Sequence, residues 1–375
     1  MTIKQSTNIF ICGDIINTKN RSLSLCDEKM KSIISQSDYS ICNLEAPLQT
    51  NSQPIRKIGA NLAQLPTTIE MLKLAGFDHC LLANNHMMDF GEEGINGTIK
   101  EIRKNGLEYS GAGLCYEDVY RPTVIRIKDK TIGLINCCEA QFGVIDYSSS
   151  SRDAGYAWVN HRKIKSVIYE LKSKCDYILL LPHAGLENVD IPLLYWKQKY
   201  REFCDAGVDA IIASHPHVPQ GYEKYKNSLI FYSLGNFYFD IHDRYIKESY
   251  SIILKIMNNG LDFEIVNHAQ QDENVVYLEE PKDVSIEKLN KLLHSDYKDL
   301  YFRTIVEQAT LLERLRCISD SRFNYDGNIV STIKGWLSSL IGRRKRIDKP
   351  LLQYHLLKNE TYHSIIKENK GNKLL

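Results

Sequence analysis

Residues 81–94, LLANNHMMDFGEEG, begin as an apolar run and end in two amides, a histidine and an aspartate. Residues 92–104, directly after this corner, have a helical pattern. An apolar strand that turns straight into a helix is typical of a βαβ unit, and therefore of a buried sheet. Asn84, Asn85, His86 and Asp89 at the corner form either an ordinary turn or part of a site.

The same alternation of strand and helix extends in both directions from this corner. Late hairpins add antiparallel strands, so we expect a mixed sheet or two packed sheets. Strands are predicted at 8–14, 39–45, 79–85, 176–183, 208–217, 228–237, 249–257 and 261–268, with a hairpin at 123–137 around Asp129 and Lys130. Helices are predicted at 27–36, 66–75, 92–104, 161–174 and 192–206.

The composition is that of an ordinary soluble protein: 375 residues, 43% hydrophobic and 25% charged, with a formal net charge of +1. Such a balance argues against nucleic acid as the main partner. Near Pro281 the sequence changes from alternating strands and helices to helices with dense charge. This change predicts a domain of residues 1–280 and a helical, basic extension of residues 281–375. The ten cysteines show no metal-binding spacing, and we find neither a signal peptide nor a membrane-spanning run, so we expect a reduced, cytoplasmic protein.

Potential metal ligands follow five of the predicted strands. They are Asp14, Glu45, Asn85, His183 with the nearby Glu187, and the pair His215 and His217. Ligands of α/β proteins bind outside the carboxyl ends of the strands, where such side chains converge. Each residue alone could be a turn, a helix cap or a solvated acid, but the mixed set together suits Mn²⁺, Fe or Zn²⁺. Its size predicts two divalent ions about 3.5–4 Å apart that share a carboxylate.

Several motifs carry a family resemblance in their order along the chain: CNLEAPL, LANNHMMDFGEEGINGT, LPHAGLE, DAGVDAIIASHPHVPQGYE and IFYSLGNFYFD. Over about residues 7–270 the sequence resembles the CapA-type proteins of poly-γ-glutamate capsule synthesis, relatives of the calcineurin-like metallophosphoesterases. The resemblance implies a four-layer α/β/β/α sandwich of two mixed sheets with a two-metal centre at one edge. It implies metal ligands at Asp14, Glu45, Asn85, His183, His215 and His217.

The sequence departs from the phosphoesterase pattern at the first strand. Phosphoesterases usually carry Asp-x-His there, whereas this chain has Asp14-Ile15-Ile16. One metal site is therefore expected to be weak, unless Glu45 or Glu187 compensates for the missing histidine.

The implied chemistry is hydrolysis by a metal-bound hydroxide, with His86 as the proton donor and Asp89 orienting it. Asn43, Asn84, Glu187 and Asn236 are expected beside the metals or the substrate. The substrate would be a phosphorylated small molecule or polymer, such as a glycan- or lipid-linked phosphate. Two alternatives stay open: hydrolysis of an amide or peptide bond by the same centre, and a non-catalytic accessory role in capsule or polyglutamate synthesis.

The basic tail has a pattern of its own. Residues 331–375 hold ten Lys and Arg against three Asp and Glu, and apolar residues from Ile329 to Ile341 recur at helical spacing just before Arg343–Arg346. Such a helix, within residues 328–346, either docks on the catalytic domain or a second subunit, or lies on the inner face of an anionic membrane.

Overall fold

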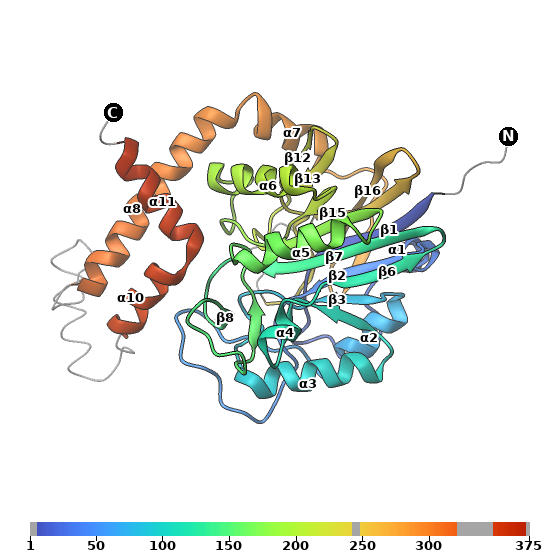
Figure 1. The fold of residues 1–375 in the computed structure, drawn as a ribbon, viewed down its shortest axis with the longest axis horizontal. Helices are drawn as coiled ribbons and strands as arrows, with labels where there is room; N and C mark the ends of the chain where they lie inside the picture. Colours follow the sequence, from blue (N-terminus) through green and yellow to red (C-terminus); the bar gives the residue numbers. More distant parts are fainter. Residues whose placement is uncertain (1–5, 242–247, 321–347, 373–375) are drawn as a thin grey trace.

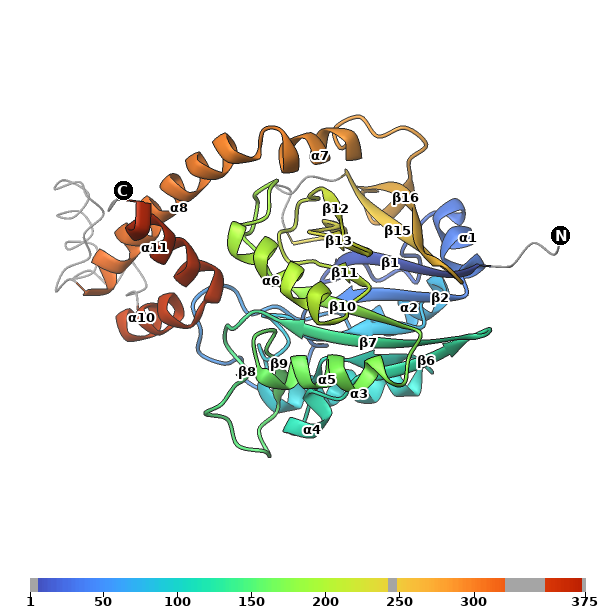
Figure 2. The same ribbon diagram turned by 45° about the horizontal axis from the view of Figure 1, so that its top comes forward.

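The computed structural model describes residues 6–241, 248–320 and 348–372. Two mixed sheets pack face to face, and helices cover the outer face of each (Figures 1 and 2). The expected α/β class and the four-layer sandwich are therefore confirmed.

The first sheet contains the N-terminal strands and the late antiparallel ones. Its strands are β1 (Thr7–Ile16), β2 (Tyr39–Leu44), β3 (His79–Leu81), β4 (Glu108–Ser110), β14 (Asn236–Phe239), β15 (Glu248–Met257), β16 (Gly260–Gln271) and β17 (Asn274–Tyr277). Their order is β17-β16-β15-β1-β2-β3-β4, and β14 also pairs with β1. Because β1 to β4 run parallel, their carboxyl ends meet at one edge of the sheet.

The second sheet is built in the same way around parallel central strands. Its strands are β6 (Thr123–Ile127), β7 (Lys130–Cys138), β10 (Tyr177–His183), β11 (Ala210–Ile212), β12 (Tyr222–Tyr225) and β13 (Ser228–Phe231), in the order β12-β13-β11-β10-β7-β6. A small third sheet consists of β5 (Ala112–Gly113), β8 (Val144–Ile145) and β9 (Gly155–Ala157). The predicted hairpin at 123–137 is confirmed as β6 and β7.

Three apolar layers hold the sandwich together. Ile11 of the first sheet and Leu134 and Leu181 of the second meet between the sheets. Helices cover the outer face of the first sheet through residues such as Ile34 and that of the second through residues such as Trp196. The helices are α1 (Glu28–Gln36), α2 (Thr68–Ala75), α3 (Gly91–Lys104), α4 (Tyr116–Val119), α5 (Arg162–Lys172) and α6 (Leu194–Ala206).

The C-terminal helices are α7 (Ile286–His294), α8 (Tyr297–Asp320), α10 (Lys349–Lys358) and α11 (Glu360–Asn372). α8 packs against both α10 and α11, and Ile305, Leu352 and Ile365 belong to the same buried cluster as Trp196 of α6. The predicted boundary at residue 280 lies between β17 and α7. The predicted amphipathic segment at 328–346 lies outside the described residues.

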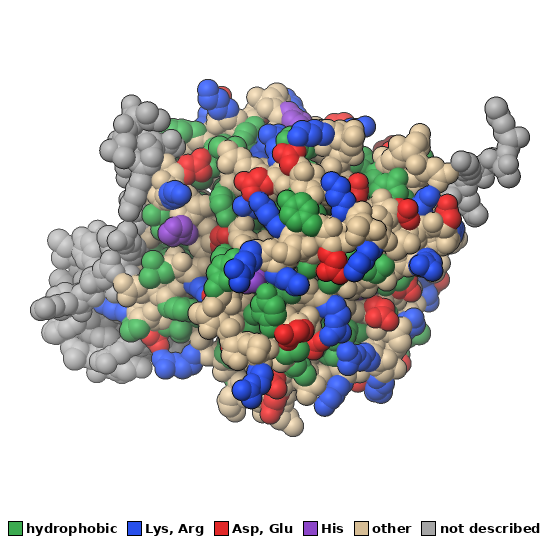
Figure 3. All heavy atoms as spheres, in the orientation of Figure 1, with side chains coloured by type: hydrophobic (Ala, Val, Ile, Leu, Met, Phe, Trp, Pro, Cys, Tyr) green, Lys and Arg blue, Asp and Glu red, His purple; other side chains and the backbone are tan. Residues whose placement is uncertain are grey.

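Basic and acidic side chains are interspersed on the face shown in Figure 3. Among the helices that the structure describes, none has both the length and the apolar character needed to cross a bilayer. The cysteines whose side chains are described are all free thiols.

Candidate metal centre

The carboxyl ends of the parallel strands in both sheets meet at one edge of the sandwich. Asp14 lies near the end of β1, Glu45 follows β2, His183 ends β10, and His215 and His217 follow β11. All five side chains are buried. The structure therefore brings these five predicted metal ligands together from strands far apart in the sequence, and the sixth, Asn85, lies beside them with its Oδ1 3.1 Å from His183 Nε2.

Two sets of potential ligand atoms stand out at this edge. Asp14, Glu45 and His183 form one set, and Glu45, His215 and His217 form the other, with the ligand atoms of each set within 4.8 Å of one another. Glu45 belongs to both sets. A carboxylate shared in this way is the arrangement expected for two neighbouring divalent ions.

The environment of Glu45 tests whether the residues fit metal ions. Both carboxylate oxygens are buried and have no hydrogen-bond partner among the described residues. Burial, and then the charge of Asp14, raise the pKa of Glu45 well above its usual value. A buried carboxylate without hydrogen bonds is strongly destabilising unless a cation compensates it. The donor set of carboxylates and imidazoles fits divalent transition ions.

Asp14 is fixed by neighbours on both sides. Its Oδ1 accepts a hydrogen bond of 2.6 Å from Asn43 Nδ2, and its Oδ2 accepts one of 3.2 Å from the backbone N–H of His215. The Nδ1 atoms of His183 and His217 lie 3.6 and 3.5 Å from Asp14. Asn43 therefore holds a candidate metal ligand in place.

The backbone at the site is strained in two places. His215 and His217 have φ values of +100° and +60°, a region that residues other than glycine rarely adopt. This conformation, with Pro216 between them, is consistent with a functional demand on the loop, since such strain persists only where the surroundings impose it.

At the first strand, a Cβ on Gly13 would lie 1.8 Å from the carbonyl oxygen of Gly235, so β1 and β14 approach closely only because residue 13 is glycine.

The other predicted amides have distinct places. Asn85 Oδ1 lies 3.1 Å from His183 Nε2, and Asn236 Oδ1 lies 3.0 Å from His217 Nδ1. Asn84 donates to the carbonyl of Leu44 at 2.9 Å and accepts from the backbone N–H of Ala46 at 3.3 Å. Asn85 and Asn236 therefore contact the histidine ligands, whereas Asn84 ties the corner after β3 to the end of β2.

Ile16 stands where the phosphoesterase pattern has a histidine, and its apolar side chain is fully buried. Glu187, one of the two residues expected to compensate, belongs to neither ligand set; its Oε1 lies 4.0 Å from His215 Nε2. A second carboxylate that the sequence reasoning missed is closer: Glu139, which follows β7, lies 3.8 Å from the same nitrogen. Burial raises the pKa of Glu139 to about 8.

His86 lies beside the ligand sets, and one of its ring nitrogens, Nδ1, contacts two charged side chains. Its Nδ1 is 2.7 Å from Asp89 Oδ2 and 3.0 Å from Lys57 Nζ, and Lys57 also pairs with Asp89. Burial, and then the charge of Lys57, lower the pKa of His86. The predicted contact between His86 and Asp89 is present. It leaves Nε2 as the ring atom available to a substrate.

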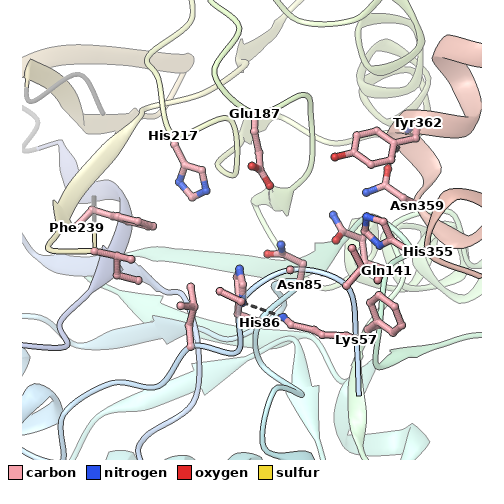
Figure 4. Close-up of a pocket in the computed structure, with 16 residues that line it drawn as sticks. Lys57, Asn85, His86, Gln141, Glu187, His217, Phe239, His355, Asn359 and Tyr362 are labelled. Atoms are coloured by element: carbon pink, nitrogen blue, oxygen red, sulfur yellow. Dashed lines mark hydrogen bonds between the residues drawn. The ribbon is translucent and has the colours of Figure 1, made fainter. Parts of the chain in front are cut away.

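A cavity of about 310 Å³ opens beside these residues. Figure 4 shows His217, Asn85 and His86 on one side of it, and Tyr362, Asn359 and His355 of the C-terminal segment on the other. Glu187 and Lys57 lie between the two sides. The residues of the site that the sequence reasoning missed are Lys57, Glu139, Gln141, His355, Asn359 and Tyr362.

The sequence is similar to a described protein family and to curated proteins of that family. Residues 9–241 match the model of a family described as bacterial capsule synthesis protein PGA_cap. The chain is 31% identical over 274 residues to the capsule biosynthesis protein CapA of Bacillus anthracis, which covers 67% of this chain and 66% of that protein. It is 28% identical over 246 residues to the PGA biosynthesis protein CapA of Bacillus subtilis (strain 168), covering 65% of this chain and 64% of that protein.

The chain therefore spans slightly less than two thirds of the length of these curated relatives. Among solved structures, a calcineurin-like phosphoesterase from Bacillus subtilis overlaps with 80% of this chain and 99% of its own, at a TM-score of 0.40 and 12% identity.

Proposed function

This chain belongs to the PGA_cap family of bacterial capsule synthesis proteins, and from that premise we propose that it is a metal-dependent hydrolase that cleaves phosphate esters. The observation that carries the proposal is Glu45, a buried carboxylate without hydrogen bonds that lies in both ligand sets. Such a group has a clear purpose in a two-ion centre and is destabilising without one.

Asp14, Glu45, His183, His215 and His217 would hold two divalent ions, with Asn85 beside them. When bound, the ions supply Lewis acidity that polarises a phosphate oxygen and activates water.

The protein's own groups supply the proton transfer. Asp89 and Lys57 occupy His86 Nδ1, which fixes the ring and leaves Nε2 facing the cavity (Figure 4). From there Nε2–H gives its proton to the leaving oxygen of the ester while Nδ1 takes one from the Lys57 ammonium, so the ring stays neutral and water in the cavity returns a proton to Lys57.

The test is a hydrolysis assay of the Mn²⁺-loaded protein on p-nitrophenyl phosphate, on its diester and on an amide substrate, a γ-glutamyl anilide. We expect activity on a phosphate ester and loss of that activity in His217→Ala. On glycerol phosphate, whose alkoxide leaving group needs a proton that nitrophenolate does not, we expect a fall of about 10²-fold or more in His86→Ala. His294→Ala, at an exposed site in the last turn of α7, is the matched control and should keep full activity.

The same panel separates the alternatives. Cleavage of the anilide alone would replace the phosphoesterase proposal with an amide hydrolase. An inactive metal-loaded protein on all three substrates would contradict catalysis and favour an accessory role in polymer synthesis.

A further inference from the structure

The helices α10 and α11 contribute one wall of the cavity. We call it the C-terminal wall, formed by His355, Asn359 and Tyr362, and Figure 4 shows it facing the side that carries His217 and Asn85. The family match ends at residue 241. This wall is thus an addition of the chain beyond the matched region.

The wall is held against the metal edge by buried and partly buried polar contacts. Glu360 accepts hydrogen bonds from Trp158 Nε1 at 3.0 Å and from the Tyr195 hydroxyl at 2.8 Å. The Thr361 hydroxyl donates to Glu139 Oε2. Contacts to two aromatic side chains and to a buried carboxylate fix the start of α11, so the wall has a defined position relative to the candidate metal ligands.

The wall presents hydrogen-bonding groups to the cavity. Asn359 Oδ1 caps α11 by accepting from the Tyr362 backbone N–H at 2.9 Å, which leaves the amide nitrogen directed at the cavity (Figure 4). Gln141 donates its amide to Glu139 Oε1 at 2.8 Å, so its own Oε1 remains as an acceptor. Donors and acceptors therefore line the same side.

The charges of the lining point to the kind of group that fits there. Within the described lining, Lys57 is the sole Lys or Arg, and its buried ammonium is paired with Asp89. Burial, and then Lys57, lower the pKa of His355, which favours a neutral ring. Glu187 adds a carboxylate. Among the lining residues that the structure describes, an anionic group at this wall would meet no unpaired Lys or Arg, whereas a hydroxyl or an amide would find partners.

We propose that the C-terminal wall selects phosphate esters whose leaving group carries uncharged hydroxyl or amide groups, and disfavours leaving groups with a second anion. This selection rests on the proposed phosphoesterase function, because the scissile phosphate must sit at the metal edge.

The test compares two matched ligands, glycerol phosphate and phosphoglycerate, which differ in a terminal hydroxymethyl group against a carboxylate. Calorimetric binding to the Mn²⁺-loaded protein should favour glycerol phosphate by about tenfold. Asn359→Asp keeps the helix cap, because a carboxylate also accepts from Tyr362 N–H, but replaces the donor with a negative charge. It should weaken the binding of glycerol phosphate by about tenfold or more. His363→Asn, on the exposed side of α11, should change nothing.

Tyr362→Phe provides a second variant if the aspartate impairs folding, since it removes only a hydroxyl and should lower the affinity for glycerol phosphate several-fold. Equal binding of both ligands by the wild type, or binding of neither, would overturn the inference even if p-nitrophenyl phosphate is hydrolysed. Selective binding of glycerol phosphate without any hydrolysis would support the wall and contradict the phosphoesterase proposal instead.

Discussion

Replacing Glu45 with glutamine should make the metal-free protein more stable and should remove its response to metal. The Glu45 carboxylate is buried, and neither of its oxygens has a hydrogen-bond partner among the described residues. Burial raises the pKa of Glu45, and the nearby charge of Asp14 raises it further. An unsatisfied buried polar group destabilises a protein by about 1–3 kcal/mol, and more when it is charged. A neutral amide of the same shape carries no charge beside Asp14 and should recover about 2 kcal/mol of the free energy of unfolding.

Metal binding reverses the order of stability. An ion that binds only the folded state adds about 2.7 kcal/mol at a free concentration of 100 times its Kd. Glu45 belongs to both ligand sets. Glu45→Gln should therefore lose most of the stabilisation by metal at both candidate sites.

The measurement is urea unfolding of wild type and variant, once in EDTA and once in excess Mn²⁺. Glu187→Gln is the matched control, because Glu187 belongs to neither ligand set, and it should keep the metal response. The reasoning fails if Glu45→Gln is less stable than the wild type in EDTA, or if Mn²⁺ stabilises both proteins equally.

Three further changes test other parts of the structure. Glu360→Ala should lower the free energy of unfolding by about 3 kcal/mol, because it leaves Trp158 and Tyr195 without their acceptor; the exposed Glu307→Ala, measured alongside, should not. Burial lowers the pKa values of His79 and His268 to about 3. In EDTA, the free energy of unfolding should therefore fall as the pH drops below about 6.5, by about 2 kcal/mol at pH 5 for each histidine. A flat urea-unfolding profile from pH 7 to 5 would contradict this. Gly13→Ala should abolish Mn²⁺ binding by calorimetry, because its Cβ would clash with Gly235.

The sign of the pH effect follows from the proton count. A histidine with a folded pKa of about 3 is neutral in the folded protein and protonated in the unfolded chain between that value and about 6.5. The unfolded state therefore binds more protons in this window, and stability rises with pH until both states are neutral.

The meeting of the candidate metal ligands at one edge could be predicted from the sequence, because each of these residues lies close to the end of its own strand. Asp14 and His183 each lie at the end of an apolar strand, and parallel strands bring such ends together. Glu139 follows β7 in the same way, so the same signal was present, but its strand was identified only as half of a hairpin. The third strand is shorter than expected and ends at Leu81, because the corner after it is fixed by Asn84 and not by strand pairing.

The remaining lining could not be predicted, for a physical reason. Lys57 lies in an irregular segment between β2 and α2 with no periodicity to read. Asn359 and Tyr362 reach the site through contacts of Glu360 and Thr361 with residues far away in the sequence. Such contacts depend on the packed sandwich, and no pattern within the C-terminal segment indicates them.

The order of the chain gives the C-terminal wall a consequence for synthesis. The residues proposed to hold metal all lie at or before His217, and the last strand of the two sheets, β17, ends at Tyr277, whereas the wall begins at His355. During translation the metal edge can assemble before the wall has left the ribosome. A chain cut between Tyr277, where the last strand ends, and His355 would keep both sheets and the candidate metal ligands and would lose the part that we propose chooses the substrate. Proteolysis in that interval would thus produce a less selective protein rather than a simply inactive one.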